Sequence, residues 1–401
     1  MKQYRVTKLG QRGDGTVTIE NGTAHVAKVL PGEMIELRDG ALLRVASPSS
    51  ERVPPFCIHY DCCGGCKFQH WQEAPYRAWK RDLLVATLAA HGLDATVAPM
   101  IDAHGEGRRR VSLHVREIIG QWRAGFMEQK THDLVAIEAC PVLVPALADA
   151  TRIAASFGPM LGPCDVAITA ADNGLDVSIR AERKAVDRRM VGFVDLMERW
   201  KLLRLSINGE VAASHGQPEV HFGSVAVPLP VQSFLQATVL GEATLTALVL
   251  DAFPKVKHVL DLFGGVGTFT LPLAEKLRVT SVDSDRQAVD ALQKAVKAAQ
   301  GLKPVTAIVR NLFNAPYTFM ELRDFDAVVL DPPRAGAEAQ ARMLAKSKIR
   351  HVAYVSCDMQ SFARDAKILA EGGFQLKQVT PVDQFKWTVH LEIVGVFTRK
   401  V

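Results

Sequence analysis

The sequence lacks the long apolar segments that membrane proteins require. No uninterrupted apolar run approaches the roughly 18–20 residues of a transmembrane helix, and the mean hydropathy is only +0.06. The opening residues, Met1–Val6, carry positive charge, but the apolar segment of a signal peptide does not follow them. We therefore expect neither a membrane span nor export, and the cytoplasm is the expected location.

A strong excess of one charge is also missing. The chain has 48 Lys and Arg against 43 Asp and Glu, a formal net charge of +5, which is compatible with a polyanionic partner without demonstrating one. The apolar fraction of 48% and the charged fraction of 23% are those of an ordinary globular protein, so disordered and fibrous classes are excluded. At about 100–200 residues per domain, the 401 residues provide for about two to four domains.

Cysteine is scarce, but it is unevenly placed. Of the seven cysteines, four lie in one short stretch and three stand alone: Cys57, Cys62, Cys63 and Cys66, against Cys140, Cys164 and Cys357. A disulfide framework would need an oxidising compartment, so the stretch indicates metal or redox chemistry instead. Cys57, Cys63 and Cys66, with Cys140 as a distant fourth, offer four thiolates. Four thiolates suit either a 4Fe–4S cluster or a structural zinc ion, and the spacing alone leaves both open.

The chain divides into three segments of different pattern. Residues 1–50 contain short alternating runs separated by turn residues, which predicts a small antiparallel β-barrel of the OB type. Residues 51–232 mix strands and helices and predict a central α+β region. The helical segment 71–104 is placed in that region, with packing on the next domain as the alternative. In residues 233–401 buried-looking strands alternate with helices, which predicts a parallel α/β sheet with helices on both faces.

A strand, a glycine-rich turn and a helix follow one another over Val259–Phe269. Glycines are needed in such a turn because the backbone must approach a ligand closely at the helix N-terminus. Asp283 ends the next strand, where a ribose diol would be bound. A nicotinamide fingerprint would place a third glycine where Thr270 stands, whereas S-adenosylmethionine sites tolerate that departure. The pattern predicts a methyltransferase and leaves its acceptor open.

Two further groups follow later strands of the same predicted sheet. The turn Asp331–Arg334, with sequence Asp-Pro-Pro-Arg, lies at the carboxyl edge, where open α/β sheets bind ligands. Amine-methylating enzymes have an aromatic residue at the last position of a similar turn, so Arg334 disfavours an amine acceptor. Cys357 ends the following strand. A lone cysteine is usually a small buried hydrophobe, but beside a cofactor site it is a candidate nucleophile.

Four motifs, in this order and spread over most of the chain, resemble those of the bacterial RNA uracil-C5 methyltransferases. The likeness is strongest to the ribosomal-RNA enzymes that carry an N-terminal TRAM barrel and a 4Fe–4S cluster. The motifs are Cys-Gly-Gly-Cys-Lys-Phe-Gln-His at 63–70, Asp-Leu-Phe-Gly-Gly-Val-Gly-Thr-Phe at 261–269, Asp-Pro-Pro-Arg-Ala-Gly at 331–336, and Val-Ser-Cys-Asp at 355–358 with His390-Leu391-Glu392.

The resemblance implies a fold and a set of site residues. It implies a Rossmann-like methyltransferase domain over 233–401, a TRAM barrel over 1–50, and a central iron–sulfur and RNA-binding region over 51–232. Cys357 would be the nucleophile and Glu392 the general base. The metal set becomes a 4Fe–4S cluster on Cys57, Cys63, Cys66 and Cys140, which leaves Cys62 as a spare thiol. Contacts to S-adenosyl-L-methionine are implied for Gln236, Phe263, Thr268, Asp283, Asn311 and Asp331.

The chemistry of uracil explains why a thiol and a carboxylate are both needed. C5 of uracil is a poor nucleophile until a thiolate, here Cys357, adds at C6 and forms an enolate that can attack the methyl sulfonium. The C5 proton must then leave before the thiolate is eliminated, and a carboxylate such as Glu392 suits that step.

The expected substrate is RNA, and the expected product contains 5-methyluridine. The target base must leave its stack to reach Cys357, so a loop or single-stranded uridine is expected. The run Arg108–Arg110 is interpreted as a phosphate-binding group. The cysteine set and the barrel favour 23S ribosomal RNA, and we expect a monomer. The alternatives are the T-loop uridine of tRNA, or an inactive iron–sulfur RNA-binding protein.

Overall fold

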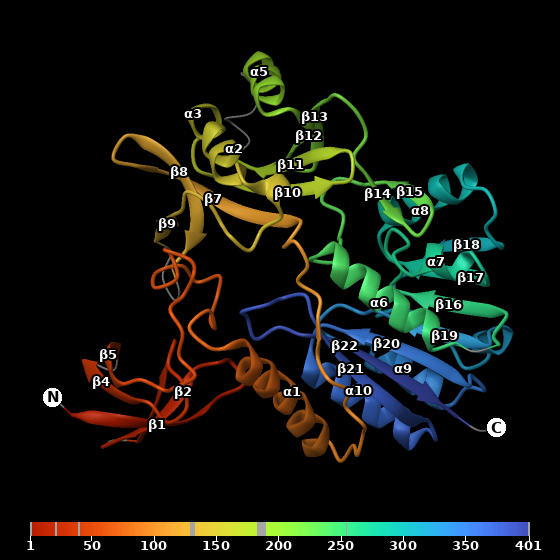
Figure 1. Ribbon diagram of the computed structural model, residues 1–401. Coiled ribbons are helices and arrows are strands. Elements are labelled where there is room, and N and C mark those ends of the chain that lie inside the picture. The colour runs from red at the N-terminus through yellow and green to blue at the C-terminus, as the bar shows by residue number, and fades with distance from the viewer. Residues whose placement is uncertain are drawn as a thin grey trace.

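A computed structural model describes residues 2–20, 22–38, 41–128, 133–182, 190–253 and 255–399 (Figure 1). The N-terminal residues form a five-stranded antiparallel sheet of order β3-β2-β1-β4-β5, which lies as a separate lobe beside the rest. Its alternating apolar residues, among them Val6, Val17 and Ile35, fill a small core of their own. The strands are β1 (Gln3–Leu9), β2 (Gly15–Ile19), β3 (Gly22–Val26), β4 (Met34–Arg38) and β5 (Ala41–Ser47).

The central region is built on a seven-stranded sheet of order β13-β12-β11-β10-β7-β8-β9. Helices cover one side of it, and the apolar residues of both close a second core. The strands are β7 (Arg110–Ile118), β8 (Gln121–Met127), β9 (Leu134–Ala136), β10 (Cys164–Ala171), β11 (Gly174–Arg180), β12 (Leu202–Ile207) and β13 (Glu210–Ser214). The helices are η1 (Pro145–Leu147), α2 (Ala150–Ser156), α3 (Gly158–Leu161) and α5 (Met190–Trp200).

The C-terminal part confirms the predicted α/β fold. Its eight-stranded sheet has the order β18-β17-β16-β19-β20-β22-β21-β6, in which β16 to β20 run parallel and β22 antiparallel. The strands are β16 (His258–Leu262), β17 (Arg278–Asp283), β18 (Val305–Val309), β19 (Ala327–Leu330), β20 (His351–Ser356), β21 (Gln375–Asp383) and β22 (Glu392–Thr398). The helices are α6 (Val239–Asp251), α7 (Thr270–Ala274), α8 (Arg286–Ala298), η2 (Glu321–Asp324), α9 (Glu338–Ala345) and α10 (Met359–Glu371).

Two earlier segments of the chain are attached to this C-terminal sheet. Helix α1 (Glu73–Ala90) packs on α10, and β6 (Ile101–Asp102) extends the sheet by pairing with β21. On α1, Lys80 is fully buried and its Nζ lies 2.8 Å from Oδ1 of Asp383. The hairpin of β14 (Glu219–Phe222) and β15 (Val225–Pro228) packs on α8. Within the described ranges, no helix is both long and apolar enough to cross a membrane.

Candidate active site

The turn after β16 brings the backbone close to the sheet edge, and only glycine fits at two of its positions. A Cβ on Gly264 would lie 2.2 Å from Oγ of Ser281. Gly267 has a φ of +105°, and a Cβ there would lie 2.7 Å from the Leu292 side chain. Phe263 has a φ of +65°, a backbone conformation that is costly for a bulky residue and is tolerated where the fold enforces it. The sequence prediction of a ligand-approaching turn therefore has a steric basis.

This turn forms one side of a cavity of about 190 Å³. Asp283, at the end of β17, accepts hydrogen bonds from the backbone N–H of Gly265 at 2.9 Å and of Asp285 at 2.8 Å. Its carboxylate is therefore held in place, with lone pairs left for a ligand hydroxyl. Four of the predicted cofactor residues line the cavity, together with Ser233 and Phe234: they are Phe263, Thr268, Asp283 and Asp331.

The other two predicted cofactor residues are placed differently. Gln236 is buried, and its Nε2 donates to Oδ2 of Asp331 at 3.4 Å, so it adjoins the cavity through that carboxyl. Asn311 follows β18, but it is not among the cavity-lining residues. Its Oδ1 instead accepts from the backbone N–H of Phe313 and Asn314 at 3.0 and 3.3 Å. In this structure the Asn311 side chain shapes its own turn.

Cys357 and Glu392 come together at neighbouring strand ends. Cys357 directly follows β20, and Glu392 is the first residue of β22, the antiparallel neighbour of β20. Burial raises the pKa of the Cys357 thiol to about 11, and the charges of Glu392 and Asp331 act in the same direction. The thiol is therefore protonated at neutral pH, and it must lose its proton as it reacts.

The carboxyl groups around Cys357 have pKa values close to neutral pH. Burial raises the pKa of Glu392 to about 8 and that of Asp331 to about 7, and each also feels a neighbouring carboxyl. A carboxyl with a pKa close to neutral pH is suited to accept a proton and release it again. The arrangement can therefore support thiol addition and proton removal at one place.

A second cavity, of about 220 Å³, opens onto Cys357. Its walls come from α1, from the N-terminus of α10, from the segment that precedes β22, and from the β1–β2 loop of the barrel. The barrel residues are Gln11 and Arg12. Cys357 therefore borders this space, and the charge of Asp331, which lines the cofactor cavity, acts on its thiol.

The four predicted metal ligands line a third cavity, of about 70 Å³: Cys57, Cys63, Cys66 and Cys140. Burial raises the pKa of Cys66 to about 11 and also raises those of Cys63 and Cys140. Cys62 is exposed and does not line this cavity. Over the part of the chain that the structure describes, three or more His, Cys, Asp or Glu side chains do not converge on a point where they could hold one metal ion.

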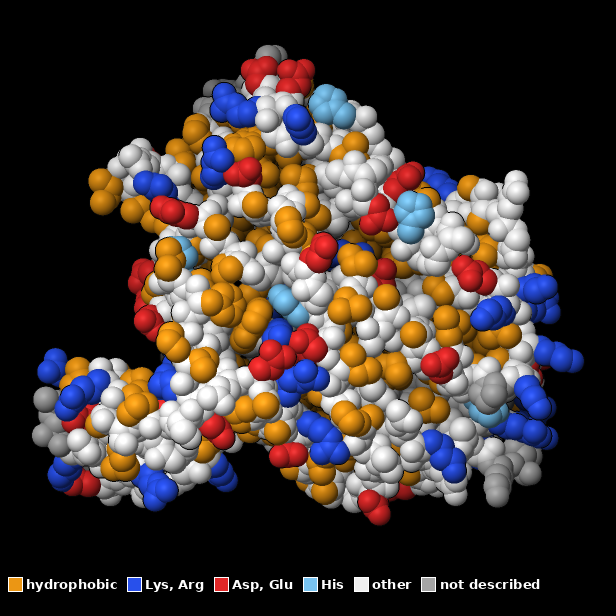
Figure 2. All heavy atoms as spheres, viewed as in Figure 1, with side chains coloured by type: hydrophobic (Ala, Val, Ile, Leu, Met, Phe, Trp, Pro, Cys, Tyr) orange, Lys and Arg blue, Asp and Glu red, His pale blue; other side chains and the backbone are white. Residues whose placement is uncertain are grey.

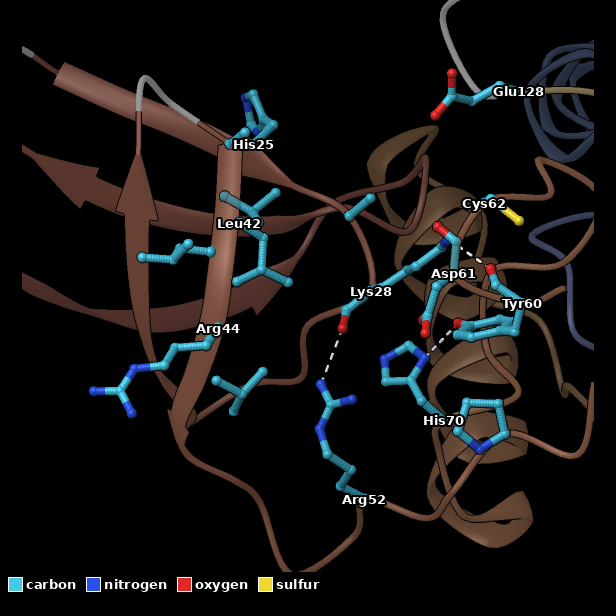
Figure 3. A pocket seen from close by; sticks show the side chains of 16 residues that line it. His25, Lys28, Leu42, Arg44, Arg52, Tyr60, Asp61, Cys62, His70 and Glu128 are labelled. Carbon is cyan, nitrogen blue, oxygen red and sulfur yellow. Dashed lines mark hydrogen bonds between the residues drawn. The ribbon is translucent and has the colours of Figure 1, made fainter. Parts of the chain in front are cut away.

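Cys62 belongs to a larger hollow of about 650 Å³ between the barrel and the central region, seen from close by in Figure 3. Its cationic side chains are already engaged. Lys28 donates to the Tyr60 carbonyl at 2.6 Å, and Arg52 bonds both oxygens of Glu33 at 2.6 and 2.8 Å. Figure 2 shows Lys and Arg side chains distributed over the surface of the barrel lobe.

The prediction that Arg108–Arg110 is a phosphate-binding group is wrong for Arg109. Arg109 is buried, and its guanidinium pairs with Glu242. Its Nε donates to the backbone carbonyl of Gln236 at 3.0 Å, so the residue supports the cofactor-side segment. Tertiary pairing of this kind leaves no signal in a run of like charges.

Sequence reasoning also missed Gln384. Its carboxamide hydrogen-bonds Gln236 at 2.7 Å and Glu392 at 3.2 Å, although no motif singled it out. Its place directly before the segment that leads to Glu392 was the one available signal.

Comparison with known proteins shows which family this chain belongs to. The sequence model of the family described as tRNA (Uracil-5-)-methyltransferase matches residues 231–401. The 23S rRNA (uracil(1939)-C(5))-methyltransferase RlmD of Halomonas elongata is 31% identical, over 98% of this chain and 88% of its own length. An RNA methyltransferase of Caulobacter vibrioides is 42% identical over 100% of both chains.

A solved structure shares the whole fold. The tRNA (uracil-54, C5)-methyltransferase of Pyrococcus abyssi, in complex with S-adenosyl-L-homocysteine, matches with a TM-score of 0.76 and 20% identity, over 99% of this chain and 100% of its own. The glycine turn, the carboxyl-edge acids and the full-length relatives agree on one assignment. The chain belongs to the RNA uracil-C5 methyltransferase family and is an S-adenosylmethionine-dependent enzyme that acts on RNA.

Proposed function

We propose that this enzyme methylates C5 of a specific uridine in 23S ribosomal RNA through a covalent bond between Cys357 and C6. The observation that carries the proposal is the placement of Cys357 and Glu392 on adjacent strand ends, with Asp331 linking them to the cofactor cavity. The Halomonas elongata relative, which acts on 23S rRNA by its name, supports the choice of RNA.

In this mechanism the thiol and the carboxylate have separate tasks. The Cys357 sulfur bonds to C6 as the thiol gives its proton to the neighbouring Asp331 carboxylate, and the electron pair of the C5–C6 double bond moves into the enolate. Bound S-adenosylmethionine supplies the methyl group, which C5 takes. The Glu392 carboxylate then removes the C5 proton, and the returning electron pair expels the Cys357 sulfur from C6. Gln236 donates a hydrogen bond to Asp331, and these two side chains lie on the side of the pocket where the methyl donor would bind.

The substrate is tested by mapping 5-methyluridine in ribosomal and transfer RNA from a deletion strain. Loss of one 23S position, restored by the wild-type gene and not by one encoding Cys357→Ala, is expected. Loss of the tRNA T-loop methyl group alone would show that the enzyme performs the same chemistry on tRNA. A methylation pattern identical to the parent strain in both RNAs would contradict the proposal.

We infer that the four-cysteine cavity holds a 4Fe–4S cluster. The residues fit such a group in two ways. The four thiols line one cavity of about 70 Å³, and four thiolates are the ligand set of such a cluster. Among the described residues, Nε and Nη2 of Arg108 and Nε2 of His59, which line the same space, are buried without a hydrogen-bond partner. Unpartnered buried donors beside thiols suit an anionic group.

The cluster is tested on anaerobically purified protein. About four irons and four sulfides per chain are expected, with a brown colour. Stoichiometric zinc without iron would overturn the assignment. Cys140→Ser should lose the iron, whereas Cys62→Ser, which changes a neighbouring thiol that does not line the cavity, should keep it. Arg108→Met should retain less iron on exposure to air.

A further inference from the structure

The carboxamide of Gln384, which contacts both Gln236 and Glu392, has all of its hydrogen-bonding capacity in use. Its Oε1 accepts from the backbone N–H of Ala237 at 2.9 Å and of Thr238 at 3.4 Å. Its Nε2 donates to Oε1 of Gln236 at 2.7 Å and to Oε1 of Glu392 at 3.2 Å. The side chain is fully buried. A carboxamide offers two N–H donors and two acceptor lone pairs, and all four are satisfied here.

The orientation of this carboxamide is decided by its surroundings. Only the carboxamide oxygen of Gln384 can accept hydrogen bonds from the two backbone N–H groups. Its nitrogen must therefore point to the other side, toward Glu392 and Gln236. Gln236 in turn has its oxygen occupied by Gln384, so its own nitrogen is directed to Asp331. These hydrogen bonds connect the backbone of residues 237–238, through Gln384, to Glu392. Through Gln384 and Gln236 they also connect it to Asp331 at the cofactor cavity.

We propose that Gln384 is a positioning residue that aligns the Glu392 carboxylate for proton removal and holds Gln236 toward the methyl donor. The proposal rests on the proposed function, since it assumes that Glu392 is the base. Gln384 does not line the cofactor cavity or the cavity at Cys357, so it acts through its two partners.

An N–H group that donates to a carboxylate base lowers the pKa of that base. The groups that act on Glu392 are Asp331 and Arg334 from the turn after β19, and Cys357 from the end of β20. On the β21 side, Asp383 next to Gln384 is paired with Lys80. Burial and Asp331 raise the pKa of Glu392, whereas Gln384 and Arg334 lower it. Removal of the donor should therefore raise the pKa further and leave less of the ionised base at neutral pH.

The experiment follows the resolution of the methylated covalent adduct in single turnover, from pH 6 to pH 9, on a denaturing gel. Gln384→Met keeps the length of the side chain and removes the donor. Its pH profile should move upward by about one unit, so that adduct resolution is about tenfold slower at pH 7. Its affinity for S-adenosylmethionine, measured by calorimetry, should fall several-fold because Gln236 is released.

Two further variants make the result decisive. Gln384→Glu keeps an acceptor for both backbone N–H groups and places a second acid against Glu392, so it should shift the profile in the same direction. Gln340→Met is the matched control, because Gln340 is an equally buried carboxamide that bonds both backbone groups of Tyr317 at 2.8 and 3.0 Å, away from the site. It should lower thermal stability and leave the pH profile unchanged.

The outcomes separate this inference from the proposed function. A wild-type pH profile in both Gln384→Met and Gln384→Glu would overturn the alignment of the base. Unchanged cofactor affinity in Gln384→Met would overturn the role toward Gln236. Failure of the wild-type enzyme to form any adduct with uridine-containing RNA would instead refute the covalent mechanism itself.

Discussion

At Cys357 the resting environment opposes ionisation. The thiol is half-buried, and Glu392 and Asp331 add negative charge beside it, while Arg334 opposes them. A free thiolate at this position would react with any electrophile that entered the pocket. Keeping the thiol protonated until RNA and cofactor are in place limits that risk, and it means that the proton must have an acceptor in the assembled complex.

Substitutions of the two proposed catalytic residues should have different effects. Cys357→Ala removes the nucleophile, so neither covalent adduct nor methylation should form. Glu392→Gln should still permit addition and methyl transfer, but it cannot accept the C5 proton. RNA should then remain bonded to Cys357 and appear as a slow band on a denaturing gel that requires S-adenosylmethionine to reach its methylated form.

The double variant is the control, because its band should vanish. Turnover of Glu392→Gln at the wild-type rate would assign the base to another group. Activity in Cys357→Ala would exclude the covalent route.

Asp283 offers a test of the cofactor cavity. Asp283→Ala removes the carboxylate that would accept ribose hydroxyls, and it also releases the N–H of Gly265. Hydrogen bonds to a charged group contribute about 1.5–3 kcal/mol, so calorimetry should show an affinity for S-adenosylmethionine lower by about ten- to a hundred-fold. Unchanged affinity with an intact fold would place the ribose contact elsewhere.

At the scale of elements, the sequence predicted best where a pattern is local. Strands β19 and β20 are mostly apolar, as buried parallel strands must be, and they belong to the alternation of buried strands and helices that was predicted for residues 233–401. The helix that was predicted to follow the glycine-rich turn is α7, which begins at Thr270, directly after that turn.

Features that depend on distant partners could not be predicted. From the sequence alone Arg109 would be taken for a surface charge. Its partner, Glu242, lies more than a hundred residues away along the chain. Gln384 acquires its contacts only when β21 and the segment before α6 meet. Among the candidate site residues, Asn311 is the one whose side chain is turned to a local structural role.

The buried pair of Lys80 and Asp383 makes a prediction for helix α1. Tyr76 donates to Asp383 at 3.1 Å and accepts from Lys80 at 3.0 Å, so the three groups form one network between α1 and β21. Lys80→Met leaves a buried carboxylate unpaired and should lower the free energy of unfolding by about 3–5 kcal/mol in chemical denaturation.

The exposed pair of Arg342 and Glu338 on α9 is the matched control for that prediction. Arg342→Met should change stability far less than Lys80→Met, because water screens the exposed pair. Equal effects of the two substitutions would show that the Lys80 network adds nothing beyond an ordinary surface pair.

At the scale of the whole molecule, three regions that are distant in sequence meet at the Cys357 cavity. The barrel contributes Gln11 and Arg12, and Lys67 from the cysteine-rich segment fixes that loop by donating to the Arg12 carbonyl at 2.6 Å. The catalytic domain contributes Cys357 and His390. The barrel loop therefore lines the same cavity as Cys357, although it lies near the start of the chain.

Arg12 should consequently contact the RNA backbone next to the flipped uridine. Its side chain is exposed at the rim of the cavity, and a phosphate contact of this kind contributes about one unit to the slope of log affinity against log salt. Arg12→Ala should weaken RNA binding, reduce that slope by about one, and leave S-adenosylmethionine affinity unchanged. Arg323→Ala, an exposed arginine in η2 at the opposite edge of the catalytic sheet, is the control and should leave the slope as it is. Equal slopes for wild type and Arg12→Ala would place the barrel loop outside the path of the RNA.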